Sequence, residues 1–171
     1  MKKILFALTA MLLLTYLGQA QDCKFRTDKV DPISGKKTQG ISLKTTLKMA
    51  VGLARSGDDY YLESYAYMGG EQNFELPEGS LLDLKLGNDV VLSLPSNVSV
   101  KPVTTVNGSA TASVSTSYLV KYKISKEQAE QIKANGIKYL RMHLNGDQGY
   151  DLEFKEKDME KSIRSAKCIF Q

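Results

Sequence analysis

Apolar and polar residues alternate along much of this chain, which is the period-two pattern of β-strands. The longest alternating run covers residues 43–53 and is expected to form one strand, with Leu47 among its core-facing side chains. A second run, Tyr60–Met68, follows the pair Gly57-Asp58, which suits a type II′ turn. The two runs are therefore expected to pair as a hairpin.

Shorter alternating runs follow. We expect Asn88-Asp89 to turn the chain between two of them, and Val98 and Val100 to begin a further strand. Asn107-Gly108 predicts a long hairpin within residues 104–117. The other alternating runs are residues 82–86, 90–94, 118–124, 140–144 and 150–154.

Two helices accompany the strands. Ser125 and Gln128 have the spacing of a capping box, and Asn135-Gly136 is expected to end that helix. The apolar spacing of residues 157–167 predicts a second helix, which is expected to end just before Cys168.

Roughly eight or nine short strands with two short helices predict a mainly β fold. The expected architecture is an antiparallel β-sandwich with one of the helices at the C-terminus. The alternative is an α+β arrangement, in which a helix packs on a curled antiparallel sheet. The length of residues 21–171 fits a single β-rich domain.

Residues 1–20 have the layout of a secretory signal peptide. Lys2 and Lys3 precede an apolar run at residues 4–17, and Gly18-Gln19-Ala20 offers small residues at the cleavage site. A membrane-spanning helix needs roughly 20 apolar residues, so this run is too short to remain as an anchor. We therefore expect export, either to the periplasm or to the cell surface or medium.

The chain contains two cysteines, Cys23 and Cys168, which lie near its two ends once residues 1–20 are removed. In an oxidising compartment the expected outcome is one disulfide that closes nearly the whole chain. The alternative is lipidation of Cys23. Asp22 stands where lipoprotein signals usually have a small residue, and lipidation would leave Cys168 without a partner.

Charge argues against nucleic acid as a partner. The formal net charge of +4 includes Lys2 and Lys3 of the leader, so the remaining chain is closer to neutral. A nucleic-acid-binding domain normally carries a clear basic stripe. The C-terminal segment does carry five basic residues, which are expected to be a solvated helix face, with a site for an acidic partner as the alternative: Lys155, Lys157, Lys161, Arg164 and Lys167.

Candidate catalytic residues are few. His143 is the single histidine, which excludes multi-histidine metal sites. We expect His143 and Arg141 to face Asp151 and Glu153 in a cross-strand charge cluster. The alternative makes His143 a general base oriented by Asp151, with a serine as nucleophile. No G-x-S-x-G motif is present to supply that serine.

Two loops share only part of a ligand-binding motif. Residues 34–38 contain a Gly-Lys pair, but Val30 and Lys37 stand where a phosphate loop needs Gly and Ser or Thr, so a turn is expected. In residues 145–153, side-chain oxygens stand at loop positions 1, 3, 7 and 9, but Tyr150 replaces the glycine of an EF-hand loop; the four residues are Asn145, Asp147, Asp151 and Glu153. We therefore expect no metal and no cofactor.

Tyr61, Tyr65 and Tyr67 form the one group of side chains for which we expect a binding role. With a two-residue turn at 57–58, they lie on the face opposite to the core, beside Lys44 and Lys48. An exposed aromatic row can stack on sugars or form a protein interface. The alternatives are that a helix or loop covers the rings, or that a three-residue turn shifts the register and buries them. In the expected register the three tyrosines face Ala54, Ala50 and Lys48.

Two segments and a basic helix carry a resemblance to a known group. The segments are Ile137-Lys-Tyr-Leu-Arg-Met-His-Leu and Gly149-Tyr-Asp-Leu-Glu-Phe-Lys, and the helix ends in Cys168. Together with Cys23 and the Asp-x-x-x-Gly turn at residues 31–35, they resemble small exported proteins of gut-type Gram-negative bacteria whose function is uncharacterised. The resemblance implies a secreted β-rich domain with joined termini, and it implies no active site.

We therefore expect an exported, non-catalytic domain that binds a protein or a glycan. The first alternative is a hydrolase whose site brings together His143, a serine and a carboxylate from distant parts of the chain. The second is an inhibitor of an exported enzyme, which would present a rigid loop at Val103–Ser117.

Overall fold

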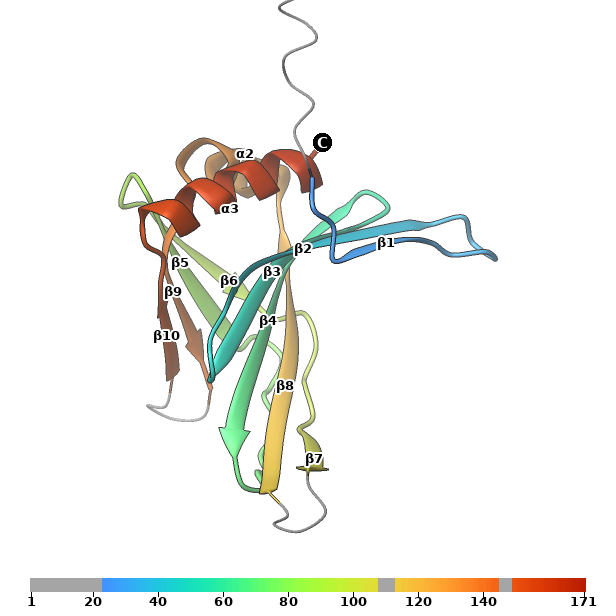
Figure 1. The fold of residues 1–171 in the computed structure, drawn as a ribbon, viewed down its shortest axis with the longest axis vertical. Helices are drawn as coiled ribbons and strands as arrows, with labels where there is room; N and C mark the ends of the chain where they lie inside the picture. Colours follow the sequence, from blue (N-terminus) through green and yellow to red (C-terminus); the bar gives the residue numbers. More distant parts are fainter. Residues whose placement is uncertain (1–22, 108–112, 145–148) are drawn as a thin grey trace, which may run out of the picture.

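The computed structural model describes residues 23–107, 113–144 and 149–171, and within these residues the chain forms two antiparallel sheets and two helices (Figure 1). The larger sheet has the strand order β1-β2-β3-β4-β8-β7 and the smaller sheet the order β10-β9-β5-β6. The strands of the larger sheet are β1 (Thr27–Val30), β2 (Lys37–Thr45), β3 (Met49–Ser56), β4 (Asp59–Gly69), β7 (Val103–Asn107) and β8 (Ser113–Ile124). Those of the smaller sheet are β5 (Leu81–Leu86), β6 (Val91–Pro95), β9 (Ile137–His143) and β10 (Gly149–Glu153).

This architecture confirms the prediction of a mainly β, sandwich-like fold with a C-terminal helix. The larger sheet is strongly curled, as the alternative arrangement required. None of the helices in the described part of the chain is both long and apolar enough to cross a membrane.

The core lies between the inner faces of the two sheets. Alternate side chains of β8, including Tyr118 and Tyr122, are fully buried, as are Leu82 of β5 and Leu140 of β9. The two sheets come into direct contact where the Ser64 hydroxyl of β4 lies 3.3 Å from the Met142 sulfur of β9 in the smaller sheet. The alternation read from the sequence therefore reports burial correctly in these strands.

Both helices lie at one end of the sheets (Figure 1). Helix α2 (Lys126–Asn135) begins with the predicted capping box, in which the Gln128 N–H donates to the Ser125 hydroxyl at 3.2 Å. It ends at Gly136, whose φ of 68° favours glycine. A Cβ at Gly136 would lie 2.8 Å from Met159 of α3 (Glu156–Ile169), so the two helices are tightly packed there.

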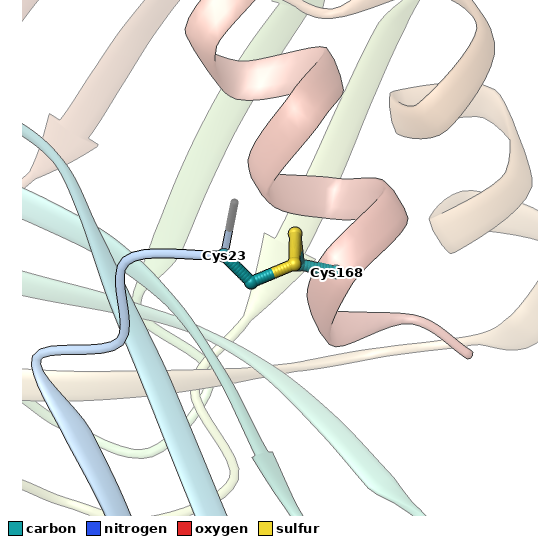
Figure 2. The surroundings of a disulfide bond; sticks show 2 residues. All are labelled: Cys23 and Cys168. Atoms are coloured by element: carbon teal, nitrogen blue, oxygen red, sulfur yellow. A yellow bond between two sulfur atoms is a disulfide. The ribbon is translucent and has the colours of Figure 1, made fainter. Parts of the chain in front are cut away.

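The prediction that the last helix ends before Cys168 is wrong. Helix α3 continues to Ile169, and both Ile169 and the following Phe170 are buried. Burial of these side chains holds the last turn against the core, so the helix includes Cys168 and ends at Ile169. Cys168 bonds to Cys23, with 5.9 Å between the two α-carbons, which confirms the predicted disulfide (Figure 2).

The single strand expected over residues 43–53 is also wrong. Strand β2 ends at Thr45, β3 begins at Met49, and the two pair as a hairpin. The Thr46 N–H donates to the Met49 carbonyl at 2.7 Å and closes the turn. Leu47 lies at its tip and is 98% exposed, although the pattern had placed it in the core.

A β-bulge explains why the alternation passes unbroken through this hairpin. The turn pairs Lys44 with Val51, so next to the turn the even-numbered residues of β2 and the odd-numbered residues of β3 share a face of the sheet. The bulge between Ser42 and Lys44 adds one residue to β2 and shifts the pairing by one position. Beyond the bulge, odd-numbered residues therefore pair with odd-numbered residues, as Ile41 does with Leu53. The large apolar residues at odd positions are therefore buried on both strands, and the sequence looks like one strand; these residues are Ile41, Leu43, Met49, Val51 and Leu53.

Two further predicted turns agree with the sequence, and one predicted strand does not form. The chain turns at Asn88-Asp89, where Asp89 has a φ of 65°, and β7 pairs with β8 as a hairpin whose tip, with Gly108, lies outside the described residues. No strand begins at Val98: among the described residues of this stretch, only isolated bridges form, at Ser96 and Val100.

Candidate functional site

The register of β3 and β4 places the three tyrosines as the sequence predicted. Tyr61 pairs with Ala54 and Tyr65 with Ala50, and the Tyr67 N–H donates to the Lys48 carbonyl at 2.8 Å. Ser56 pairs with Asp59, so the turn between these strands has two residues and does not shift the register. The tyrosines therefore lie on the face of the larger sheet that points away from the core.

Tyr65 and Tyr67 form an aromatic pair on this face. Their ring centroids are 6.5 Å apart and the ring planes differ by 11°. The Arg26 guanidinium lies 5.9 Å from the centroid of Tyr65, within the range of a cation–π interaction. Tyr67 is 39% exposed, and its backbone carbonyl accepts a hydrogen bond from the Tyr150 hydroxyl at 3.1 Å. Tyr67 is thus accessible, and the pair is contacted by Arg26, which precedes β1, and by Tyr150 of β10.

Two apolar side chains from distant parts of the chain extend the pair. Leu119 of β8 pairs with Tyr65, and Ser117 pairs with both Tyr67 and Val103. Paired residues in an antiparallel sheet share a face, with Cβ atoms about 5 Å apart. Leu119 is 37% exposed and Val103 is 61% exposed. We name the surface formed by Lys48, Tyr65, Tyr67, Val103 and Leu119 the tyrosine face.

Tyr61 does not belong to this row. Glu63 separates it from Tyr65 on the same strand, and Tyr61 instead lines a cavity of about 380 Å³ together with Glu63 and Lys121. Glu63 is 7% exposed, and its carboxylate pairs with Arg26 at 2.6 Å and with Lys121 at 3.2 Å. The cavity therefore combines an aromatic wall with a buried carboxylate whose charge is compensated.

Lys44 does not lie beside the tyrosines, and that expectation is wrong. Because the bulge in β2 pairs Lys44 with Val51, its side chain is on the opposite face of the sheet. Its ammonium donates to the Glu153 carbonyl at 2.7 Å and forms an ion pair with Asp158 of α3. Lys44 therefore joins the larger sheet to α3 and is not available to a ligand on the tyrosine face.

The expected charge cluster on β9 and β10 is confirmed for one pair only. Arg141 donates to Asp151 at 2.7 and 3.0 Å, and this contact lowers the pKa of Asp151 to about 2. His143 lies 2.7 Å from Asp83 of β5 instead of facing Asp151 or Glu153. The sequence could not show this partner, because β5 and β9 are far apart along the chain.

The arrangement around His143 is not that of a serine nucleophile. The Ser93 hydroxyl donates to the carboxylate of Asp83 at 2.5 Å, so the aspartate lies between the serine and the histidine. A triad requires the histidine in the middle, where it can accept the serine proton. Burial raises the pKa of Asp83, but the hydrogen bonds from Ser93 and His143 outweigh it and the net shift is downward. Ser93, Asp83 and His143 therefore form a cross-strand hydrogen-bond chain.

Of the two loop motifs, one forms a turn and the other lies partly outside the described residues. Asp31 accepts hydrogen bonds from the N–H groups of Ile33 and Ser34 at 2.9 and 2.7 Å, which confirms the predicted turn. Asn145 and Asp147 of the calcium-like loop lie outside the described residues. Within the described ranges no group of three or more potential ligands could hold a metal ion.

Val103, Leu119 and Glu63 were not identified from the sequence. Val103 and Leu119 join the tyrosine face only through the pairing of β4 with β8 and of β8 with β7.

Comparison with known proteins finds no relative: the chain matches no family model, no curated protein and no solved structure.

Proposed function

We propose that this protein is an exported, non-catalytic domain that binds a protein or a glycan through the tyrosine face. The observation that carries the proposal is the accessible, nearly parallel pair formed by Tyr65 and Tyr67, flanked by Leu119 and Val103. Exposed apolar groups gathered on one surface are typical of interaction sites. The disulfide and the signal-peptide layout of residues 1–20 support export.

A glycan is the better supported of the two partners. A sugar ring has apolar faces that stack on aromatic rings and hydroxyl groups that need hydrogen-bond partners. The tyrosine face offers the rings, and the neighbouring cavity offers Tyr61, Glu63 and Lys121 as polar groups. Arg26 contacts both Tyr65 and Glu63, so it connects the two parts of the site.

The test is a glycan array and a pull-down with cell-wall preparations, comparing the wild type with Tyr65→Ala/Tyr67→Ala. Loss of both rings should weaken binding at least about tenfold, which corresponds to about 1.4 kcal/mol. Tyr139→Ala is a matched control, because Tyr139 also has an arginine 5.9 Å from its ring but belongs to the smaller sheet. Thermal unfolding of each variant shows that the fold is retained.

A second arm separates glycan from protein. Cell-wall material is used before and after protease digestion, so that a protein partner is lost while a polysaccharide remains. Retention after digestion, with loss in Tyr65→Ala/Tyr67→Ala, supports glycan binding. Equal retention of the wild type and this double variant would discard the tyrosine face as the site.

A further inference from the structure

A second cavity lies at the disulfide. It has a volume of about 670 Å³ and lies between the N-terminal segment 23–26, strand β2 and the second half of α3. Figure 2 shows the N-terminal segment beside the last turns of α3, where Cys23 meets Cys168. Pockets for small molecules have volumes of about 300–1,000 Å³, so this one has the size of a ligand site.

Part of the lining is apolar. Ile41 of β2 is almost fully buried, Phe25 packs against the core, and the Cys23–Cys168 disulfide forms a further part of the wall. Because the disulfide ties the N-terminal segment to α3, both sides of the cavity are held in place before any ligand arrives. A preformed site avoids much of the entropic cost of ordering on binding.

The rest of the lining is basic. Four cationic side chains contribute to it, and none of the described residues that line it is acidic: Lys24, Arg26, Lys161 and Arg164. Lys161 donates to the Leu43 carbonyl at 2.8 Å, a neutral acceptor that leaves its positive charge in place. Arg164 lies 3.6 Å from Glu160, and both side chains are more than half exposed. Arg26 is compensated by Glu63.

We propose that this cavity binds an anionic amphiphile, a molecule with one apolar chain and a carboxylate head group. The chain would lie against Phe25, Ile41 and the disulfide, where removal of its CH₂ groups from water favours binding. The carboxylate would lie among Lys161 and Arg164 at the rim, where the local charge is complementary. This function is distinct from the one proposed for the tyrosine face, although Arg26 lines the cavity and also contacts Tyr65.

The probe is sodium decanoate below its micelle concentration, titrated by calorimetry into purified protein with its disulfide intact. Decanol tests the chain without the charge, and acetate tests the charge without the chain. We expect saturable binding of decanoate, at least tenfold weaker binding of decanol, and no measurable binding of acetate. Raising the salt concentration should weaken decanoate binding, because the rim is exposed.

Variants locate the site. Lys161→Gln and Arg164→Gln should each weaken decanoate binding at least fivefold. Lys167→Gln is the matched control, since it removes the same charge from the same helix but Lys167 does not line the cavity. Ser42→Leu should fill the cavity and abolish binding, and its unfolding curve shows whether the fold is retained.

Four results would overturn the proposal. Three of them are the absence of saturable decanoate binding, equal binding of decanol, and an equal effect of Lys167→Gln. Binding of an acidic peptide without decanoate would also overturn it, in favour of a protein interface. Tyr67→Ala removes a ring of the tyrosine face but leaves the contact between Arg26 and Tyr65 in place, and it should bind decanoate as the wild type does, so the two proposals can fail independently.

Discussion

Removal of the Cys23–Cys168 disulfide should lower the free energy of unfolding by about 3–5 kcal/mol. The bond joins residues separated by 145 positions, so it closes a loop that contains nearly the whole described chain. In the chain-entropy model, a loop of this length removes about 17 cal/mol/K from the unfolded state, or about 5 kcal/mol at 25 °C. Measured losses are often smaller than this model gives, which sets the lower end of the range.

The variant is Cys23→Ala/Cys168→Ala, and the assay is urea unfolding followed by circular dichroism and tyrosine fluorescence. The chain has nine tyrosines and no tryptophan, so tyrosine emission is the available intrinsic probe. The slope of the free energy against urea should increase, because an unfolded chain without the cross-link exposes more surface. The midpoint should fall accordingly.

Reduction provides the control for this experiment. Wild-type protein treated with dithiothreitol should unfold like the double variant, and the same treatment should leave the double variant unchanged. A loss below about 1 kcal/mol, or a reduced wild type as stable as the oxidised one, would refute the reasoning. In that case the N-terminal segment and α3 would be held together by packing alone.

Further predictions concern single side chains. Tyr122→Phe should raise the free energy of unfolding by about 1–2 kcal/mol in urea, because the buried hydroxyl has no hydrogen-bond partner among the described residues; destabilisation would reveal a hidden partner. The Arg141 guanidinium holds the pKa of Asp151 at about 2, below its ordinary 3.8, so the resulting stabilisation is present above about pH 4 and is lost as the pH falls toward 2. In an NMR titration Arg141→Gln should move that pKa toward 3.8, and an unchanged value would contradict the assignment. Leu53→Ala should cost about 2–5 kcal/mol and Leu47→Ser less than about 0.5 kcal/mol, because Leu53 is fully buried and Leu47 is 98% exposed; similar losses would mean that the β2–β3 turn is misplaced.

Local chemistry made several elements predictable. The capping box at Ser125 needs only the neighbouring residues, and the positive φ of Gly136 follows from what glycine alone tolerates at a helix end. The turn at Gly57-Asp58 determined the register of the tyrosines because a two-residue hairpin leaves one pairing available. In each of these cases the interacting groups lie within a few positions of one another.

Prediction failed where the deciding contact is distant or where two local effects cancel. The bulge near Ser42 and the turn at Thr46 each reverse the alternation, and together they leave no trace of the hairpin in the pattern. His143 finds Asp83 across the β5–β9 pairing, sixty positions away. Cys168 stays helical because the residues after it are buried against the core, which the helix periodicity does not reveal.

The amino-acid order alone therefore predicted a disulfide-closed, mainly antiparallel β-protein and the outward direction of Tyr61, Tyr65 and Tyr67, and the structure confirms these predictions. Which surfaces gather around these residues depended on the folded chain. The pairing of β4 with β8 brings Leu119 beside Tyr65, and the docking of α3 on the larger sheet forms the basic cavity. Strand pairing and helix docking join residues far apart in sequence, and alternation along one strand carries no information about its neighbours.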